Sequence, residues 1–96
     1  MLTLKEIKRA VAKIGKRYGI KNAYLFGSYA KGEASEGSDV DLIIERGQIE
    51  TLMQLSGFRL DLIDELGKEV DVITDDGVTP SFYELIRNDR VLVYGV

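Results

Sequence analysis

Residues 23–45 read AYLFGSYAKGEASEGSDVDLIIE, in which two apolar runs enclose a segment containing glycine and serine. The runs at 23–26 and 40–45 have the length and side chains of buried strands. Residues 28–38 between them predict a loop with at most one helical turn. We therefore expect two strands of a small sheet, joined by a connection too irregular to be a long helix.

The N-terminal segment predicts an amphipathic helix. Apolar residues at positions 4, 7, 11, 14 and 18 follow the helical spacing and form one stripe. Thr3 and Glu6 match a capping box at its start. Gly19 is suited to end the helix, because glycine readily adopts the left-handed conformation found after a last turn.

The remaining chain predicts two more helices and two more strands. We expect a helix over 49–66 that ends at Gly67, a strand over 70–73 and a turn at 75–77. Residues 79–81 with Glu84 then predict the start of a short helix, with Ser81 and Glu84 as its capping box, and residues 91–94 predict a last strand or an extended tail. This alternation indicates an α/β (α+β) fold, a small mixed sheet with helices packed on it, in one domain over residues 1–96. The apolar positions of 49–66 exceed one core-facing stripe, so they serve either deeper burial or a partner surface.

The composition excludes several kinds of chemistry. The chain has no cysteine and no histidine, which removes disulfides, thiolate or imidazole metal sites and histidine-based catalysis. No apolar run approaches the roughly 20 residues of a membrane span. No secretory leader is visible at the N-terminus, so a cytoplasmic location is expected.

Charge is unevenly distributed along the chain. Residues 1–32 carry eight basic side chains and one acid, whereas residues 33–96 carry five basic and fifteen acidic side chains. Such asymmetry suits an anionic ligand or partner, although a solvated basic helix explains it as well. Direct nucleic-acid binding is disfavoured, because most of the chain is acidic and contains no recognisable reading motif.

Three aspartates occupy strand positions where apolar residues are expected. Asp39 and Asp41 flank Val40, so their side chains leave the same face of the strand. Asp71 lies in the 70–73 strand and joins them if the two strands are neighbours. Carboxylates held this close repel each other, and a cation such as Mg²⁺ removes that cost. Alternatively, Asp39 caps a turn and the other two lie on a solvated edge strand.

A second candidate element directly follows the first strand. Gly27 permits close approach of a ligand to the backbone, and Ser28 lies where a helix would begin, which favours an anion. Lys31 adds positive charge, and Ser38 either contacts a phosphate or caps the turn before Asp39. A glycine–serine pair alone is weak evidence, because such a serine is commonly just a helix cap.

Together these elements resemble a known signature. A glycine–serine turn after a strand, two aspartates ten residues later and a third aspartate on another strand are similar to the DNA polymerase β superfamily of nucleotidyltransferases. Residues 26–42 and 66–74 resemble the minimal nucleotidyltransferases of prokaryotes, and the resemblance covers essentially the whole chain. One departure is Lys31, where arginine is commoner; the charge is kept but bidentate phosphate binding is lost.

The resemblance implies an enzyme and assigns roles to these residues. Gly27 and Ser28 would hold the phosphates of ATP, with Lys31 and Ser38 as further nucleotide contacts. Asp39, Asp41 and Asp71 would be the catalytic residues and the ligands of two Mg²⁺ ions. AMP would be transferred and pyrophosphate released.

The resemblance also implies a partner. Minimal nucleotidyltransferases of this kind act as antitoxins that add AMP to a tyrosine of a HEPN-type ribonuclease toxin from the adjacent gene. A chain of 96 residues leaves little room for a second domain, so we expect a partner, or a second copy in a homo-oligomer, to complete the acceptor surface. The alternatives are an antitoxin that acts by occlusion alone, or a transferase acting on a small molecule or an RNA end.

Overall fold

The computed structural model describes residues 1–95 of the chain. Its elements alternate between helices and strands, as the sequence predicts. In chain order they are α1 (Leu4–Tyr18), β1 (Asn22–Phe26), α2 (Gly27–Lys31), β2 (Val40–Glu45), α3 (Leu52–Leu66), β3 (Val70–Thr74), the 3₁₀ turn η1 (Asp75–Gly77), α4 (Pro80–Ile86) and β4 (Val91–Tyr94).

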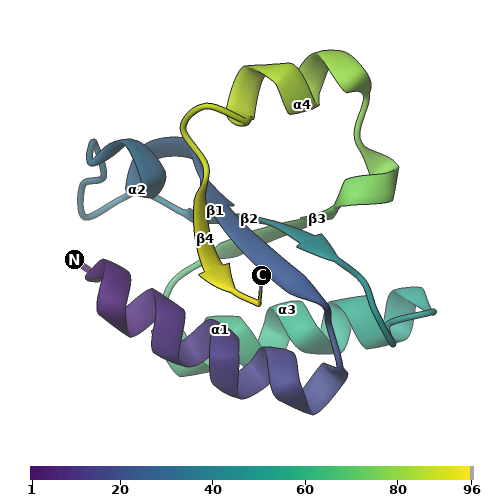
Figure 1. The fold of residues 1–96 in the computed structure, drawn as a ribbon. Helices are drawn as coiled ribbons and strands as arrows, with labels where there is room; N and C mark the ends of the chain where they lie inside the picture. The colour runs from purple at the N-terminus through teal and green to yellow at the C-terminus, as the bar shows by residue number, and fades with distance from the viewer. Residues whose placement is uncertain (96) are drawn as a thin grey trace.

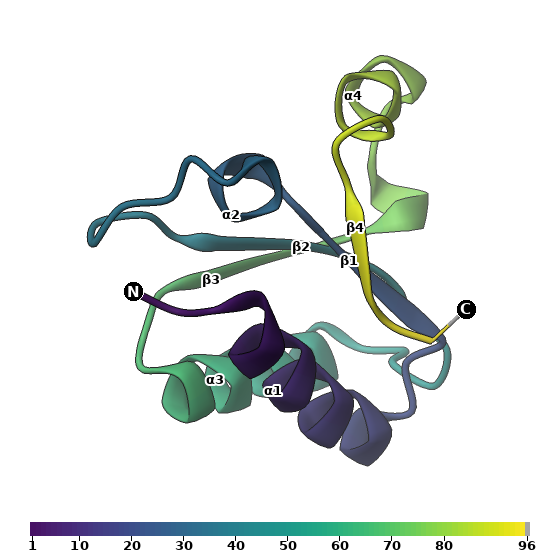
Figure 2. The ribbon, with the colours of Figure 1, turned by 60° about the vertical axis from the view of Figure 1, so that its left-hand side comes forward.

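The four strands form one mixed sheet in the order β3-β2-β1-β4. β1 is antiparallel to β2 and to β4, whereas β2 and β3 are parallel. A parallel pair needs a long crossover, which α3 supplies. Helices α1 and α3 lie side by side on one face of the sheet, and α4 stands on the opposite side (Figures 1 and 2). The predicted fold class is confirmed.

The hydrophobic core fills the space between the sheet and the α1–α3 layer. Alternate residues of the central strands, such as Leu25 and Leu42, are fully buried there against Ile7, Ile14 and Phe58 of the two helices. Because side chains alternate across a strand, the residues between them point to the other face of the sheet, here called the open face. That face carries the polar residues of the central strands.

Most predicted boundaries are confirmed, and two are wrong. Thr3 and Glu6 form the predicted capping box, and Gly19 ends α1 in the left-handed conformation. Helix α3 begins at Leu52 rather than residue 49, because Thr51 caps it together with Gln54. The last helix is capped by Thr79, not Ser81.

The start of α4 has a local cause. Pro80 occupies the first helical turn, where its missing N–H costs nothing and its fixed φ is already helical. The hydroxyl of Thr79 accepts a hydrogen bond from the backbone N–H of Phe82 at 3.1 Å. Ser81 is thereby left inside the helix.

Helix α3 has more apolar side chains than its core contacts use. Phe58 and Leu62 are buried, whereas Leu52 and Met53 are each 85% exposed and Leu60 is 57% exposed. Deeper burial within this chain therefore does not explain the three exposed residues. No helix in the described part of the chain is long and apolar enough to cross a membrane.

Candidate active site

The sheet register brings the aspartates of β2 and β3 together. Asp41 pairs directly with Asp71 on the neighbouring parallel strand, and with Phe26 on the other side. Asp39 immediately precedes β2, two residues before Asp41 and therefore on the same side of the strand. The prediction that Asp71 joins the other two carboxylates depended on β2 and β3 being neighbours, and they are.

Burial and neighbouring negative charges both act on the carboxyl of Asp41. Partial burial is the largest cause that raises the pKa of the Asp41 carboxyl, and with the negative charges of Asp71 and Asp39 it brings that pKa to about 6. A side-chain hydrogen bond with Asp71 also favours the protonated form. The site therefore holds a carboxylate whose charge is destabilised by its own neighbours, which is typical of functional carboxylate clusters.

The donor set suits Mg²⁺. Three carboxylates supply the hard oxygen ligands that this ion prefers, and a divalent cation would offset the repulsion centred on Asp41. Within residues 1–95, no three acidic side chains already converge into a complete metal-binding cluster. Asp39 and Asp71 are both solvent-exposed, so their carboxylates have room to adjust.

Gly27 lies against Asp41. It follows β1 directly and begins the single-turn helix α2 with a φ of 72°. A Cβ atom at this position would overlap Oδ2 of Asp41 and lie 3.3 Å from its Cγ. Glycine is therefore required twice, by the left-handed backbone and by the contact with Asp41. Ser28 follows in the first turn of α2, so the glycine–serine turn begins beside Asp41.

The other two predicted nucleotide contacts lie at the margin of this site. Lys31 is exposed in the last turn of α2. The hydroxyl of Ser38 accepts a hydrogen bond from the backbone N–H of Ser35 at 2.8 Å, and the Ser38 N–H donates to the Ser35 carbonyl at 3.0 Å. Ser38 thus stabilises the turn before Asp39, which is the alternative role that the sequence allowed.

One residue that supports the site was missed by the sequence reasoning. Lys68, just before β3, donates from Nζ to the backbone carbonyls of Glu36 and Ser38. It ties the loop that precedes Asp39 to the strand that carries Asp71. No local sequence pattern predicts this role for Lys68, because Lys68 and Ser38 are 30 residues apart in the chain.

The raised pKa of Asp41 predicts a pH-dependent gain in stability for Asp41→Asn. The folded state binds this proton more tightly than the unfolded state, so wild-type stability falls as the pH rises from about 4 through about 6. In metal-free buffer, the variant is expected to be more stable than wild type by about 1 kcal/mol above pH 7, a value discounted because the group is only partly buried.

Thermal unfolding of both proteins at pH 4 and pH 7.5 measures this difference. The advantage of Asp41→Asn is expected at pH 7.5 and should shrink to a small fraction at pH 4, where Asp41 is protonated in the folded wild type and about half protonated in the unfolded chain. An equal difference at both pH values would show that the asparagine acts by packing and not by charge.

Comparison with known proteins identifies the family of this chain. The sequence profile of the nucleotidyltransferase domain family matches residues 4–93. A relative from Methanocaldococcus jannaschii, assigned as a protein adenylyltransferase, is 39% identical over 90 residues, which are 94% of this chain and 97% of the relative. The protein adenylyltransferase MntA of Thermococcus cleftensis is 30% identical over 97 residues, covering 97% of this chain and 98% of that protein.

Solved structures share the fold. A chain described as a minimal nucleotidyltransferase has a TM-score of 0.80 at 30% identity, over 94% of this chain and 95% of that one. A chain from the complex of a tri-AMPylated Shewanella oneidensis HEPN toxin with MNT antitoxin has a TM-score of 0.75 at 14% identity, over 98% and 74% of the two chains. A toxin–antitoxin structure with AMP-PNP has a TM-score of 0.80 at 18% identity, over 93% and 73%.

The profile match spans nearly the whole chain, in which Asp41 pairs with Asp71 and Gly27 lies against Asp41. The chain therefore belongs to the nucleotidyltransferase domain family, as a minimal nucleotidyltransferase.

Proposed function

We propose that this protein is a Mg²⁺-dependent antitoxin that transfers AMP from ATP to a tyrosine of a HEPN ribonuclease toxin. The observation that carries the proposal is the contact of Gly27 with Asp41, directly beside Asp71 on the next strand. This contact puts a turn suited to phosphate next to carboxylates suited to metal. Both would be needed for nucleotidyl transfer.

In this proposal each residue of the site has a role. Gly27 and Ser28 contact the β- and γ-phosphates through backbone N–H groups and a hydroxyl, while Asp39 and Asp41 hold Mg²⁺. Bound Mg²⁺ would neutralise charge on the triphosphate and on the attacking oxygen. Asp71 accepts the proton of the acceptor hydroxyl as its oxygen attacks the α-phosphorus. The bond from the α-phosphorus to the bridging oxygen breaks, and pyrophosphate leaves.

The names of related proteins support the donor and the acceptor class. Two relatives at 39% and 30% identity bear the name protein adenylyltransferase. Structural neighbours include a toxin–antitoxin pair with an ATP analogue and a tri-AMPylated HEPN toxin bound to its antitoxin. The toxin would be encoded by the adjacent gene, and both proteins would act in the cytoplasm.

The exposed apolar side chains of α3 support the need for a partner. Leu52, Met53 and Leu60 remain largely solvent-exposed in the isolated chain. An exposed apolar patch of this kind is suited to a protein interface. We assign it to the toxin, with a second copy of this chain as the alternative occupant.

Intact-mass spectrometry of the product of the adjacent gene, after incubation with this protein, Mg²⁺ and ATP, tests the proposal. The partner is expected to gain whole AMP units, and peptide mapping should locate them on tyrosine. A stable complex whose mass does not change would instead favour occlusion as the mechanism. Transfer to RNA ends or small molecules, with the partner unmodified, would favour a different acceptor.

A further inference from the structure

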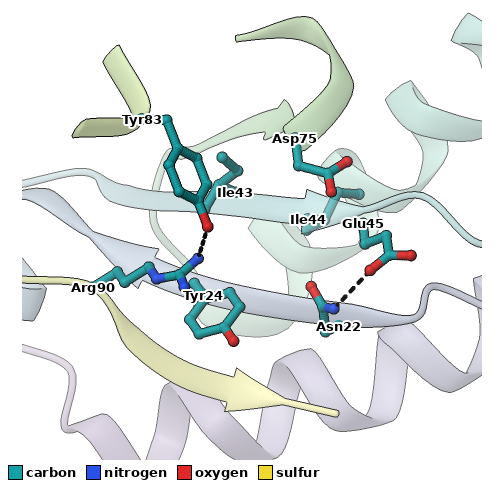
Figure 3. A pocket seen from close by; sticks show the side chains of 8 residues that line it. All are labelled: Asn22, Tyr24, Ile43, Ile44, Glu45, Asp75, Tyr83 and Arg90. Atoms are coloured by element: carbon teal, nitrogen blue, oxygen red, sulfur yellow. Dashed lines mark hydrogen bonds between the residues drawn. The ribbon is translucent and has the colours of Figure 1, made fainter. Parts of the chain in front are cut away.

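A hollow of about 170 Å³ lies on the open face, between the sheet and α4. Its base is formed by Tyr24 of β1 and Ile43 of β2, and Tyr83 of α4 stands over it (Figure 3). The hollow is too small for a whole nucleotide, since sites for drug-sized ligands run from roughly 300 Å³ upward. It is of a size for one ring system.

One end of the hollow presents a fixed cation. The guanidinium carbon of Arg90 lies 4.0 Å from the ring centroid of Tyr24 and 5.1 Å from that of Tyr83. Its NH1 also donates to the hydroxyl of Tyr83 at 2.7 Å. Two ring contacts and a hydrogen bond hold the guanidinium in place, and Tyr83 engages only one of its five N–H donors.

The other end presents carboxylates. Glu45, the last residue of β2, accepts a hydrogen bond from Nδ2 of Asn22 at 3.0 Å. Asp75 lies beside it at the end of β3, and Figure 3 shows both acids at the end of the hollow opposite Arg90. Carboxylate oxygens accept hydrogen bonds, so this end favours a donor group on a ligand, next to the Nζ of Lys21 that lies 3.6 Å from Oε2 of Glu45.

The hollow shares one strand and one face with the candidate active site. Ile43 and Glu45 follow Asp41 by two and four residues on β2, so all three side chains leave the same face. At the usual rise of a strand, they lie about 7 and about 13 Å along the sheet from Asp41. A nucleoside whose α-phosphate lies at Asp41 can therefore reach the hollow with its base.

We propose that this hollow is the nucleobase subsite, and that Glu45 and Asp75 select a base with an exocyclic amino group. The proposal rests on the proposed nucleotidyltransferase activity and extends it to the identity of the donor. In adenine, the 6-amino group would donate to Glu45 or Asp75 while a ring nitrogen accepts from the Arg90 guanidinium. A carbonyl in place of the amino group would face the acids without a donor, which is unfavourable.

The polarity of the hollow favours a base over an acceptor tyrosine. A phenol has one polar atom and would satisfy only one end of a site that has a cation at one end and carboxylates at the other. An amino-bearing purine carries acceptors and a donor on one rigid ring, and so matches both ends. The apolar side chain of Ile43 between them suits the face of that ring.

Calorimetric binding of ATP, purine riboside triphosphate and inorganic tripolyphosphate in the presence of Mg²⁺ tests the proposal. Purine riboside triphosphate differs from ATP only by the missing 6-amino group, and tripolyphosphate has no nucleoside. We expect ATP to bind about tenfold more tightly than purine riboside triphosphate, the effect of one hydrogen bond to a charged group. In the double variant Glu45→Gln, Asp75→Asn, the ratio of the affinity for ATP to the affinity for purine riboside triphosphate should fall to about one. The affinity for tripolyphosphate should not change.

The matched control is Glu50→Gln, which removes an exposed acid just beyond β2 that has no ion pair among the described residues. It should leave the ratio at its wild-type value. Equal affinities for ATP and purine riboside triphosphate in the wild type, or a ratio unaffected by the double substitution, would overturn the base subsite while the phosphate site stands. If tripolyphosphate, ATP and purine riboside triphosphate all fail to bind, both the base subsite and the proposed nucleotidyltransferase function are wrong.

Discussion

Replacing Asp39 or Asp41 with asparagine is expected to lower AMP transfer by about 10³-fold or more, while the domain remains folded. An amide has nearly the size of the carboxylate but lacks the negative charge that holds a divalent cation. Asp41 is partly buried beside Asp71, and loss of its charge relieves repulsion there. The variants should therefore lose activity without losing stability.

Transfer is measured by the mass gain of the partner at a fixed time, and folding by thermal unfolding of the same samples. Asp64→Asn is the matched control, because it makes the same change at an exposed acid of α3, on the opposite side of the sheet from the site. It should retain wild-type activity. Undiminished transfer by both Asp39→Asn and Asp41→Asn would disprove the assignment of these carboxylates as metal ligands.

Gly27→Ala is expected to reduce transfer by about 10²-fold through displacement of Asp41. The added Cβ would overlap Oδ2 of that carboxylate, so either the glycine–serine turn or the aspartate must move. A shift of about 1 Å in a reacting group can cost this much in rate. The left-handed backbone at Gly27 adds a cost of about 1–2 kcal/mol in stability.

Gly32→Ala separates these two effects. Gly32 ends α2 with the same φ of 72°, but a Cβ there would meet nothing within 4 Å. The backbone strain should therefore be similar in the two variants, while only Gly27→Ala disturbs the site. Equal losses of activity in both variants would mean that strain in α2, and not the contact with Asp41, causes the defect.

Local sequence rules identified the elements where a single segment carries all the required information. The capping box of Thr3 and Glu6 and the end of α1 at Gly19 depend on residues a few positions apart. The start of α3 was wrong by three residues because Ile49 is apolar and buried but lies outside the helix. The hydrophobic pattern shows which residues are buried. The helix instead begins where the Thr51 side chain can accept a hydrogen bond from a free backbone N–H group of the first helical turn.

The residues of the candidate site also fall into two groups, those that local sequence rules identify and those that only the structure shows. The pair at Asp39 and Asp41 and the turn at Gly27 could be identified from spacing, since strand geometry fixes the direction of neighbouring side chains. The resemblance to a family supplied the link between them. Lys68 and Arg90 could not be found, because their partners lie on other elements and no local pattern marks the contact.

The sequence by itself determined which chemistry is open to this protein. Without histidine or cysteine, that chemistry rests on carboxylates, hydroxyls, lysine or arginine, and backbone groups, and the pattern of these residues resembles that of the nucleotidyltransferases. Only the tertiary structure decided that Asp71 pairs with Asp41, that Gly27 lies against Asp41, and that Arg90 and Glu45 enclose one hollow. These are contacts between separate strands and helices, and strand order and register fix them through the burial of a shared core.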